Sequence, residues 1–279
     1  MRNIFLVSIL LYKVFLTFHH TFSYLRTIKQ KDIKNQSKMF LLYCIVAVFT
    51  TVQAVQFTFV NNHPSTIWVG SLGNDGKPPV NEGGWEMAAG SQVTVDVDGS
   101  WAGRFWARTG CNFDENGNGH CDTGDCGNVL KCNGAGGAPP VTLAEITLQG
   151  SDGNDFYDIS NVDGFNIPVT FAPTDKSGSG YDCSEASCTA NINNECPDDL
   201  RQVVNGETVG CKSACLAFDT DQYCCRNSFG TPDTCKASDW PQNYPEFFKQ
   251  RCPDAYSYAY DDQKSTFTCS DTGYKIVFG

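Results

Sequence analysis

The chain has 279 residues, of which 41% are apolar and 18% charged, a composition typical of a globular protein. The formal net charge is −11, but residues 55–279 alone carry 13 basic and 30 acidic side chains. Such a surface repels phosphate backbones and anionic lipid, because binding to either depends on clustered lysine and arginine. The charge therefore argues against nucleic acid as a partner and leaves neutral glycans or cationic partners.

Two apolar stretches open the chain, Ile4 to Phe18 and Met39 to Ala54. Both are short for a membrane span. The second follows a lysine-rich run and ends Val52-Gln53-Ala54, with small residues where signal peptidase requires them. We therefore interpret residues 39–54 as a signal peptide, which predicts secretion and no stable membrane insertion of the mature chain. Residues 1–38 are then an N-terminal extension, either sequence upstream of the true start or a membrane anchor.

The cysteine count agrees with secretion. Of 15 cysteines, Cys44 alone lies in the predicted signal peptide, so its removal leaves an even number, 14. An even count in a secreted chain indicates disulfides, here seven. Zinc is the alternative, but the repeated C-x2-C spacing of zinc modules is missing and the mature body has only His63 and His120. We therefore expect no metal and no cofactor.

Several segments alternate apolar and polar residues with a period of two. Val93, Val95 and Val97 alternate with polar residues and are followed by an Asp98-Gly99 turn, which predicts an antiparallel strand with one solvated face. Further strands are expected within residues 57–59, 104–109, 141–148, 156–160 and 274–278. Short strands bounded by Gly and Asn turns favour a β-sandwich or barrel.

Two regions differ from this pattern. Residues 109–140 are rich in Gly, Asn, Asp and Cys, and residues 183–252 hold nine of the 14 mature cysteines. Both have too few apolar residues for a core, so disulfides must substitute for burial. We expect them to be loop regions. The segments Pro197–Val204, Cys211–Asp219 and Pro245–Gln250 show the most helical character.

A sequence motif identifies the family. Gly117 to Cys126 reads GNGHCDTGDC and, with Cys132 after it, resembles the signature of the thaumatin family, although Asn128 stands where a second glycine is usual. Other segments agree in the same order, including Trp106-Ala-Arg-Thr, Tyr223-Cys-Cys and Phe247 to Tyr258. The resemblance covers residues 56–279. It identifies the chain as similar to pathogenesis-related thaumatin-like proteins, in an animal-type form with 14 mature cysteines.

The resemblance implies a mainly β fold with a thaumatin-like β-sandwich core and two disulfide-rich loop domains. The thaumatin-like domain, residues 55–279, would place the sandwich at about 55–108, 141–189 and 253–279, and the loop domains at about 109–140 and 190–252. The disulfides that the resemblance implies are Cys111–Cys121, Cys126–Cys132, Cys183–Cys269, Cys188–Cys252, Cys196–Cys211, Cys215–Cys224 and Cys225–Cys235.

One disulfide of the family is missing. Members commonly have sixteen cysteines, and here His63 and Gly279 stand where the first and the last are expected. A bridge that closes so long a loop contributes about 5 kcal/mol at most by chain entropy. We therefore expect the strand pair at the chain termini to be frayed.

The resemblance also implies an acidic cleft between the sandwich and the larger loop region. Family members that act on glucans or fungi line it with one Arg, one Glu and three Asp. The matching positions here are Arg104, Glu145, Asp158, Asp163 and Asp261, with Asp262 as the alternative to the last.

Glycoside hydrolysis needs one carboxylic acid and one carboxylate. On this hypothesis Glu145 is the acid, one of the aspartates is the ionised partner, and Arg104 lowers the pKa of a neighbour. The alternative is structural. Asp163-Gly164 is also a good hairpin turn, Asp158 can cap local backbone, and Arg104 with Glu145 can form a structural ion pair.

A second acidic pattern runs from Asp114 to Asp125. It matches a calcium-binding EF-hand loop except that aspartate replaces the final glutamate. Cys121 lies inside the pattern and no helical periodicity flanks it, and the resemblance explains the same residues as a disulfide-bonded loop. We therefore expect no calcium site.

The resemblance implies the function of a secreted thaumatin-like defence protein. Such a protein would bind β-1,3-glucan of the fungal cell-wall type in an acidic cleft and be antifungal. Two alternatives stay open: an endo-β-1,3-glucanase that uses Glu145 and an aspartate, and a non-enzymatic inhibitor of a foreign hydrolase. Whether the chain is an enzyme is left open. We expect an extracellular monomer with a β-1,3-glucan or a related polysaccharide as its partner and no nucleic acid.

Overall fold

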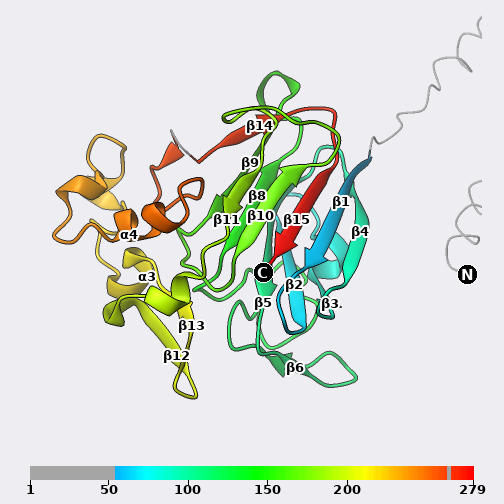
Figure 1. Cartoon of the computed structure of the whole chain (residues 1–279), viewed down its shortest axis with the longest axis horizontal. Helices are drawn as coiled ribbons and strands as arrows, with labels where there is room; N and C mark the ends of the chain where they lie inside the picture. The colour runs from blue at the N-terminus through cyan, green and yellow to red at the C-terminus, as the bar shows by residue number, and fades with distance from the viewer. Residues whose placement is uncertain (1–53, 263–264) are drawn as a thin grey trace, which may run out of the picture. The chain divides into compact units, whose positions relative to one another are not determined.

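The computed structural model describes residues 54–262 and 265–279 (Figure 1). Residues 1–38 and the predicted signal peptide lie outside the described residues, except that Ala54 begins the first strand. Within the described part, no helix is long and apolar enough to cross a membrane.

Two sheets form the core of the molecule. Their strands are β1 (Ala54–Asn61), β2 (Ile67–Gly73), β3 (Gly84–Met87), β4 (Gln92–Asp98), β5 (Ala102–Arg108), β8 (Leu143–Thr147), β9 (Asp155–Ser160), β10 (Val169–Pro173), β11 (Ala186–Cys188), β14 (Phe267–Cys269) and β15 (Tyr274–Phe278). One sheet has the order β14-β9-β8-β5-β2-β3 and the other β11-β10-β15-β1-β4. Among these strands only β1 and β15 pair in parallel.

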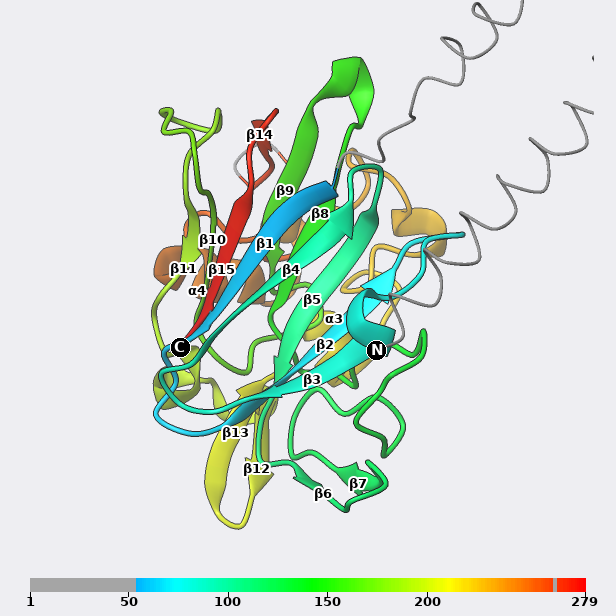
Figure 2. The same ribbon diagram turned by 90° about the vertical axis from the view of Figure 1, so that its right-hand side faces the viewer.

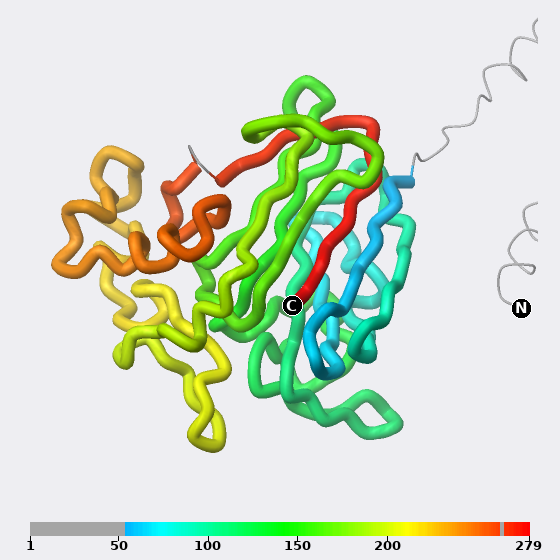
Figure 3. The backbone as a smooth tube through the Cα atoms, viewed as in Figure 1, coloured from blue at the N-terminus to red at the C-terminus, as the bar shows by residue number. Residues whose placement is uncertain are grey.

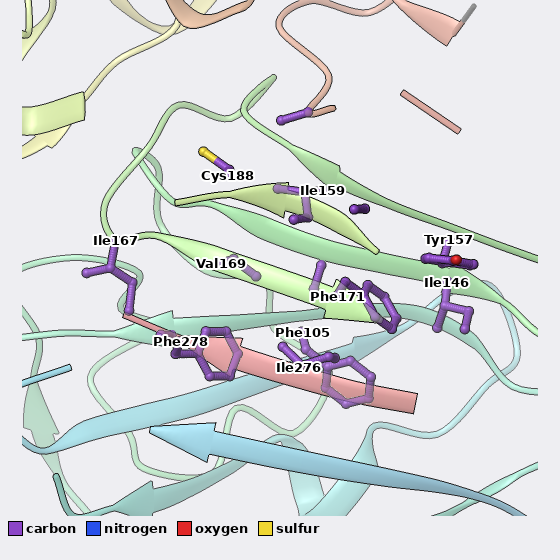
Figure 4. Close-up of a cluster of buried hydrophobic side chains, with 14 of the residues drawn as sticks. Phe105, Ile146, Tyr157, Ile159, Ile167, Val169, Phe171, Cys188, Ile276 and Phe278 are labelled. Carbon is purple, nitrogen blue, oxygen red and sulfur yellow. The ribbon is translucent and has the colours of Figure 1, made fainter. Parts of the chain in front are cut away.

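Aromatic side chains fill the space between the sheets (Figure 4). Phe57 and Phe59 of β1 and Phe105 of β5 are fully buried. The ring centroid of Phe105 lies 5.6 Å from that of Phe57 and 4.9 Å from that of Phe59. Such pairs stabilise by about 0.5–1.5 kcal/mol beyond the area they bury. The predicted mainly β fold is confirmed, with a sandwich whose layers are joined by aromatic contacts.

The first loop region, residues 109–140, carries a short hairpin, β6 (Asn112–Phe113) and β7 (Gly119–His120). The second, residues 189–252, carries the hairpin β12 (Arg201–Val204) and β13 (Glu207–Cys211) and the helices α3 (Ala214–Phe218) and α4 (Tyr244–Arg251). Figure 2 shows both hairpins extending from the same end of the sandwich. The 3-10 helices are η1 (Val80–Gly83), η2 (Ser151–Gly153), η3 (Ile192–Glu195), η4 (Asp198–Leu200), η5 (Asn227–Phe229) and η6 (Ala237–Asp239).

Two of the three predicted helical segments contain an α-helix, and the prediction for Pro197–Val204 is wrong. After the short η4, this segment is the strand β12. The reason is the turn that follows, where Asn205 and Gly206 both have positive φ angles, 51° and 88°. Asn-Gly is the preferred pair for a tight hairpin turn, and the β-branched Val203 and Val204 before it favour a strand.

Seven disulfides connect the described cysteines: 111 with 121, 126 with 132, 183 with 269, 188 with 252, 196 with 211, 215 with 224 and 225 with 235. Each joins the two cysteines that the resemblance pairs. Two staple the first loop region and three the second. Cys188–Cys252 attaches the end of α4 to β11 and so to the sandwich. The loop regions therefore depend on covalent links where apolar burial is scarce.

Arg108, at the end of β5, is fully buried and attaches the first loop region to the sheet. Its guanidinium donates hydrogen bonds to the carbonyl oxygens of Trp68 and Val69 in β2 and of Val129 and Leu130 in the loop. Burial lowers the pKa of Arg108 to about 10, against the opposing effect of Asp125. The side chain is therefore still charged at neutral pH.

We predict that Arg108→Met lowers the free energy of unfolding by at least about 3 kcal/mol, because four carbonyls in buried or partly buried hydrogen bonds lose a charged donor at about 1–3 kcal/mol each. Urea denaturation of the oxidised protein measures the change. The control is Arg226→Met, because Arg226 is half exposed and pairs with surface carboxylates of Asp219 and Asp221. Its loss should stay within about 1 kcal/mol. Equal losses in the two variants would contradict the role given to Arg108.

The terminal strands lie side by side, with β15 in red next to β1 in blue (Figure 3). Their register continues to Asn61 opposite Phe278. The amide of His63 donates to the carbonyl of Phe278 at 3.1 Å, and a Cβ on Gly279 would lie 2.3 Å from His63 N. The two positions of the missing bridge are therefore neighbours. Fraying of this pair stays a prediction.

We predict that His63→Cys combined with Gly279→Cys forms an eighth disulfide that raises the free energy of unfolding by up to about 5 kcal/mol. Residue 279 must shift to make room for a Cβ. Hydrogen exchange of the β15 amides should slow relative to both single variants. Exchange that is already slow without the bridge would show that the strand is not frayed.

Candidate functional site

The register of three neighbouring strands sets the candidate site. Arg104 of β5 lies opposite Glu145 of β8, and Glu145 lies opposite Asp158 of β9. Side chains directly opposite each other have Cβ atoms about 4.5–5.5 Å apart and share a face of the sheet. Phe105 points into the core, so alternation places Arg104 on the outer face. The three polar side chains thus form one row across the outside of the six-stranded sheet.

This row lines a cleft of about 390 Å³. The segments after β9 and after α4 form its other side, and they contribute Val162, Asp163, Tyr256 and Ala259. Three of the lining side chains, Glu145, Asp158 and Asp163, are carboxylic acids on separate elements. The cleft therefore concentrates acidic groups next to a single arginine. We call it the acidic cleft from here on.

Arg104 and Glu145 form an ion pair, with 3.6 Å between Nε and Oε1. Glu145 needs such a partner, because it shares a strand face with apolar Leu143. Burial nevertheless raises the pKa of Glu145; Arg104 opposes this rise and Asp163 adds to it.

Asp158 has the most perturbed environment of the cleft. Burial raises its pKa well above the ordinary value, the charges of Glu145 and Asp262 raise it further, and Arg104 opposes the rise. Its Oδ1 is buried without a hydrogen-bond partner among residues 54–262 and 265–279. Burial also raises the pKa of Asp163. Burial thus makes all three carboxyls harder to ionise than usual, and Arg104 forms its ion pair with Glu145.

The fifth expected acid, Asp261, does not line the acidic cleft. Its carboxylate lies 2.9 Å from Lys249 Nζ and accepts hydrogen bonds from the amide and hydroxyl of Ser257. Asp262, the alternative, accepts from the Tyr256 hydroxyl and acts on the pKa of Asp158. The structure thus brings together Arg104, Glu145, Asp158 and Asp163, with Asp262 rather than Asp261 nearby.

Sequence reasoning missed Tyr256 as a site residue. It lines the acidic cleft, donates to Asp262 and contacts the Thr266 hydroxyl. Burial raises its pKa, so the phenol stays protonated and can donate a hydrogen bond. It belongs to a segment that carries the family resemblance, which is the one signal that pointed to it.

A larger hollow of about 720 Å³ lies where β1, β9 and β15 begin. Two of its three carboxylates, those of Asp155 and Asp175, are already engaged. Asp155 accepts from the Tyr274 hydroxyl and the Gln149 amide, and Asp175 accepts from Thr174 and Gly273. Acids held by the protein's own donors are less suited to bind a ligand. We therefore place the candidate site at the smaller, acidic cleft.

The acidic loop of the first loop region binds its own backbone. Asp114 accepts from the amides of Asn116 and Asn118, and Asp125 accepts from those of Cys121 and Gly127. These contacts explain the EF-hand-like spacing as loop closure. Among the described residues no cluster of His, Cys, Asp or Glu is suited to hold a metal ion.

Comparison with known proteins shows which family the chain belongs to. Its residues 61–279 match the model of the thaumatin family. The chain belongs to the thaumatin family. Pathogenesis-related protein 5 of Arabidopsis thaliana is 50% identical over 241 residues, which are 85% of this chain and 97% of that protein. A Prunus avium protein named glucan endo-1,3-beta-glucosidase is 47% identical over 233 residues, 82% of this chain and 92% of that one.

Solved structures agree with this family's fold. The laminaripentaose-producing β-1,3-glucanase of glycoside hydrolase family 64 from Paenibacillus barengoltzii has a TM-score of 0.55 and 14% identity, covering 84% of this chain and 78% of that one. At this identity the likeness concerns the fold alone.

The raised pKa of Asp158 implies that this residue changes the free energy of unfolding with pH. A carboxyl whose pKa is higher in the folded state stabilises the fold below its unfolded pKa, and this contribution is lost as pH rises through the folded pKa. Asp158→Asn should therefore raise the free energy of unfolding by about 1–2 kcal/mol at pH 7. At pH 3, where the wild-type carboxyl is protonated in both states, the gain should vanish.

Urea denaturation at the two pH values measures the difference, and Asp114→Asn is the control. Hydrogen bonds from Asn118 lower the pKa of Asp114, so its carboxylate stabilises the fold above the unfolded pKa. This variant should lose stability at pH 7 and not at pH 3. A gain in Asp158→Asn that is the same at both pH values would contradict the assigned electrostatics.

Proposed function

We propose that this thaumatin-family protein is a secreted monomer that binds β-1,3-glucan of the fungal cell-wall type in the acidic cleft and acts against fungi. The observation that carries the proposal is the row of Arg104, Glu145 and Asp158, which lines a cleft on the outer face of the sheet. The names of two relatives, pathogenesis-related protein 5 and glucan endo-1,3-beta-glucosidase, support it. Seven disulfides agree with an oxidising, extracellular environment.

The chemistry of the acidic cleft suits a neutral sugar polymer. Each glucosyl hydroxyl both donates and accepts hydrogen bonds. Arg104 offers donors, the Glu145 carboxylate offers acceptors, and a protonated Asp158 offers both. The acidic surface repels anionic polymers but not an uncharged glucan. Glucan is therefore the better partner for this set of groups.

Hydrolysis of the bound glucan is the second candidate function. It is favoured by the neighbouring carboxyl groups of Glu145 and Asp158. On this proposal Asp158 protonates the glycosidic oxygen as the C1–O bond breaks, and Glu145 attacks C1 to form a glycosyl ester. Water then hydrolyses the ester with Asp158 as the base. These roles reverse those expected from the sequence, because the ion pair with Arg104 stabilises the carboxylate form of Glu145.

Two assays on the full secreted protein test these functions: reducing-sugar release from laminarin and retention on insoluble β-1,3-glucan. If the protein hydrolyses glucan, Glu145→Gln should lower release at least about 100-fold, because it loses its carboxylate, while retention stays within a few-fold. Glu86→Gln is the control, because Glu86 is exposed on β3 away from the acidic cleft and the charge change is the same.

Release that Glu145→Gln removes identifies a glucanase, and retention without release identifies a glucan-binding defence protein. Absence of both would overturn the glucan proposal. It would favour the third function expected from the sequence, an inhibitor of a foreign hydrolase, for which the loops rather than the acidic cleft would make the contacts.

A further inference from the structure

A second, small hollow adjoins the acidic cleft on the side of the second loop region. It has a volume of about 50 Å³ and shares Val162 and Ala259 with the acidic cleft. Its walls include the rings of Tyr223, Trp240 and Tyr258. We call it the aromatic corner. A ligand that lies in the acidic cleft and extends past Val162 would next reach the aromatic corner.

Trp240 carries a buried donor that the protein leaves without an acceptor. The residue is 6% exposed, and its Nε1 has no hydrogen-bond partner in residues 54–262 and 265–279. The rings of Tyr223 and Tyr258 lie nearly perpendicular to it, at 81° and 80°, with centroids 5.1 and 5.6 Å away. A buried donor without an acceptor destabilises the protein. An acceptor on a bound ligand would recover this energy.

The aromatic corner is also rigid. The bonded cysteines Cys215 and Cys224 form part of its wall, and the neighbouring Cys225 is tied to Cys235. Ser213, which also lines the corner, caps α3 by accepting a hydrogen bond from the Leu216 amide. A site held by two disulfides and a helix cap loses little entropy when a ligand binds.

Size and charge limit the ligand. A volume of about 50 Å³ exceeds the roughly 30 Å³ share of one water but is too small for a sugar ring. The charges of Asp261 and Asp262 act on Tyr258 and, after burial, raise its pKa, so the corner also disfavours an anion. A small, neutral group with an acceptor oxygen fits, and a hydroxymethyl group meets all three conditions.

We propose that the aromatic corner binds the hydroxymethyl group of the glucosyl residue that follows the two residues occupying the acidic cleft. Its oxygen accepts a hydrogen bond from Trp240 Nε1, and the sugar ring rests against the edge formed by Tyr258. Aromatic rings offer apolar surface to the C–H groups of a sugar, and tyrosine adds a hydroxyl. The inference rests on the proposed glucan binding and adds that affinity depends on the length of the glucan chain.

The test compares laminaribiose, short enough to occupy the acidic cleft alone, with laminarihexaose, by titration calorimetry. Trp240→Phe keeps an aromatic ring and removes the N–H. It should weaken binding of the hexaose about 5-fold, the loss of one hydrogen bond of about 1 kcal/mol, and leave the biose unchanged. Trp85→Phe is the matched control, because Trp85 Nε1 is also buried without a partner but its ring packs on Phe59 in the core. It should change neither affinity.

A second measurement uses the wild-type protein and does not depend on how the variants fold. In a spectrum of 15N-labelled tryptophan, hexaose should shift the Trp240 indole N–H resonance downfield, and biose should leave it in place. The Trp85 resonance should not move with either sugar.

The outcomes distinguish a failure of the aromatic corner from a failure of the glucan proposal. Hexaose binding that Trp240→Phe leaves intact, with a stationary Trp240 resonance, overturns the aromatic corner and leaves the glucan proposal standing. No binding of either oligosaccharide by the wild-type protein overturns both. A Trp240 resonance that stays fixed while the hexaose binds would mean that the N–H faces a tyrosine ring and serves packing alone.

Discussion

The register of β5 against β8 and of β8 against β9 is the constraint on which the site depends. A slip of one residue would turn Arg104, Glu145 or Asp158 into the core, because side chains alternate between the faces of a strand. The register is fixed by residues outside the site. Phe105 is held between aromatic rings of the opposite sheet, and Arg108 ends β5 with hydrogen bonds to four carbonyls. Apolar packing and a buried cation thus position an acidic row that could not hold itself together.

The carboxyl groups of the acidic cleft lower the stability of the fold locally, and the surrounding structure compensates. The pKa values of Glu145, Asp158 and Asp163 are all raised, so ionising them at neutral pH opposes folding. Functional sites commonly break local rules of stability in this way, and the rest of the structure compensates. Here the aromatic core and the seven disulfides do so. The fold can therefore retain a cluster of partly buried acids that does not stabilise it at neutral pH.

Much of the fold could be predicted from the sequence, because the strand pattern and the cysteines leave local signals. The hairpin of β12 and β13 was not predicted. Asn205-Gly206 is a turn signal, but Pro197–Val204 was predicted to be helical. The choice between Asp261 and Asp262 could not be made, because it depends on Lys249 and Ser257, which fix Asp261 from other segments. The raised pKa values of Glu145 and Asp158 depend on burial, which no sequence spacing reveals. Nor does the sequence show that Trp240 lacks an acceptor.

The parallel pairing of β1 with β15 has a consequence for the order in which the chain can fold. β15 lies between β1 and β10, so the centre of one sheet comes from residues 274–278. While the polypeptide is being synthesised, β1 and β10 have no strand between them until those residues have emerged. Contacts that distant in sequence close slowly, and unpaired strand edges attract other chains. This sheet of the sandwich can therefore be completed only after both loop regions have been synthesised.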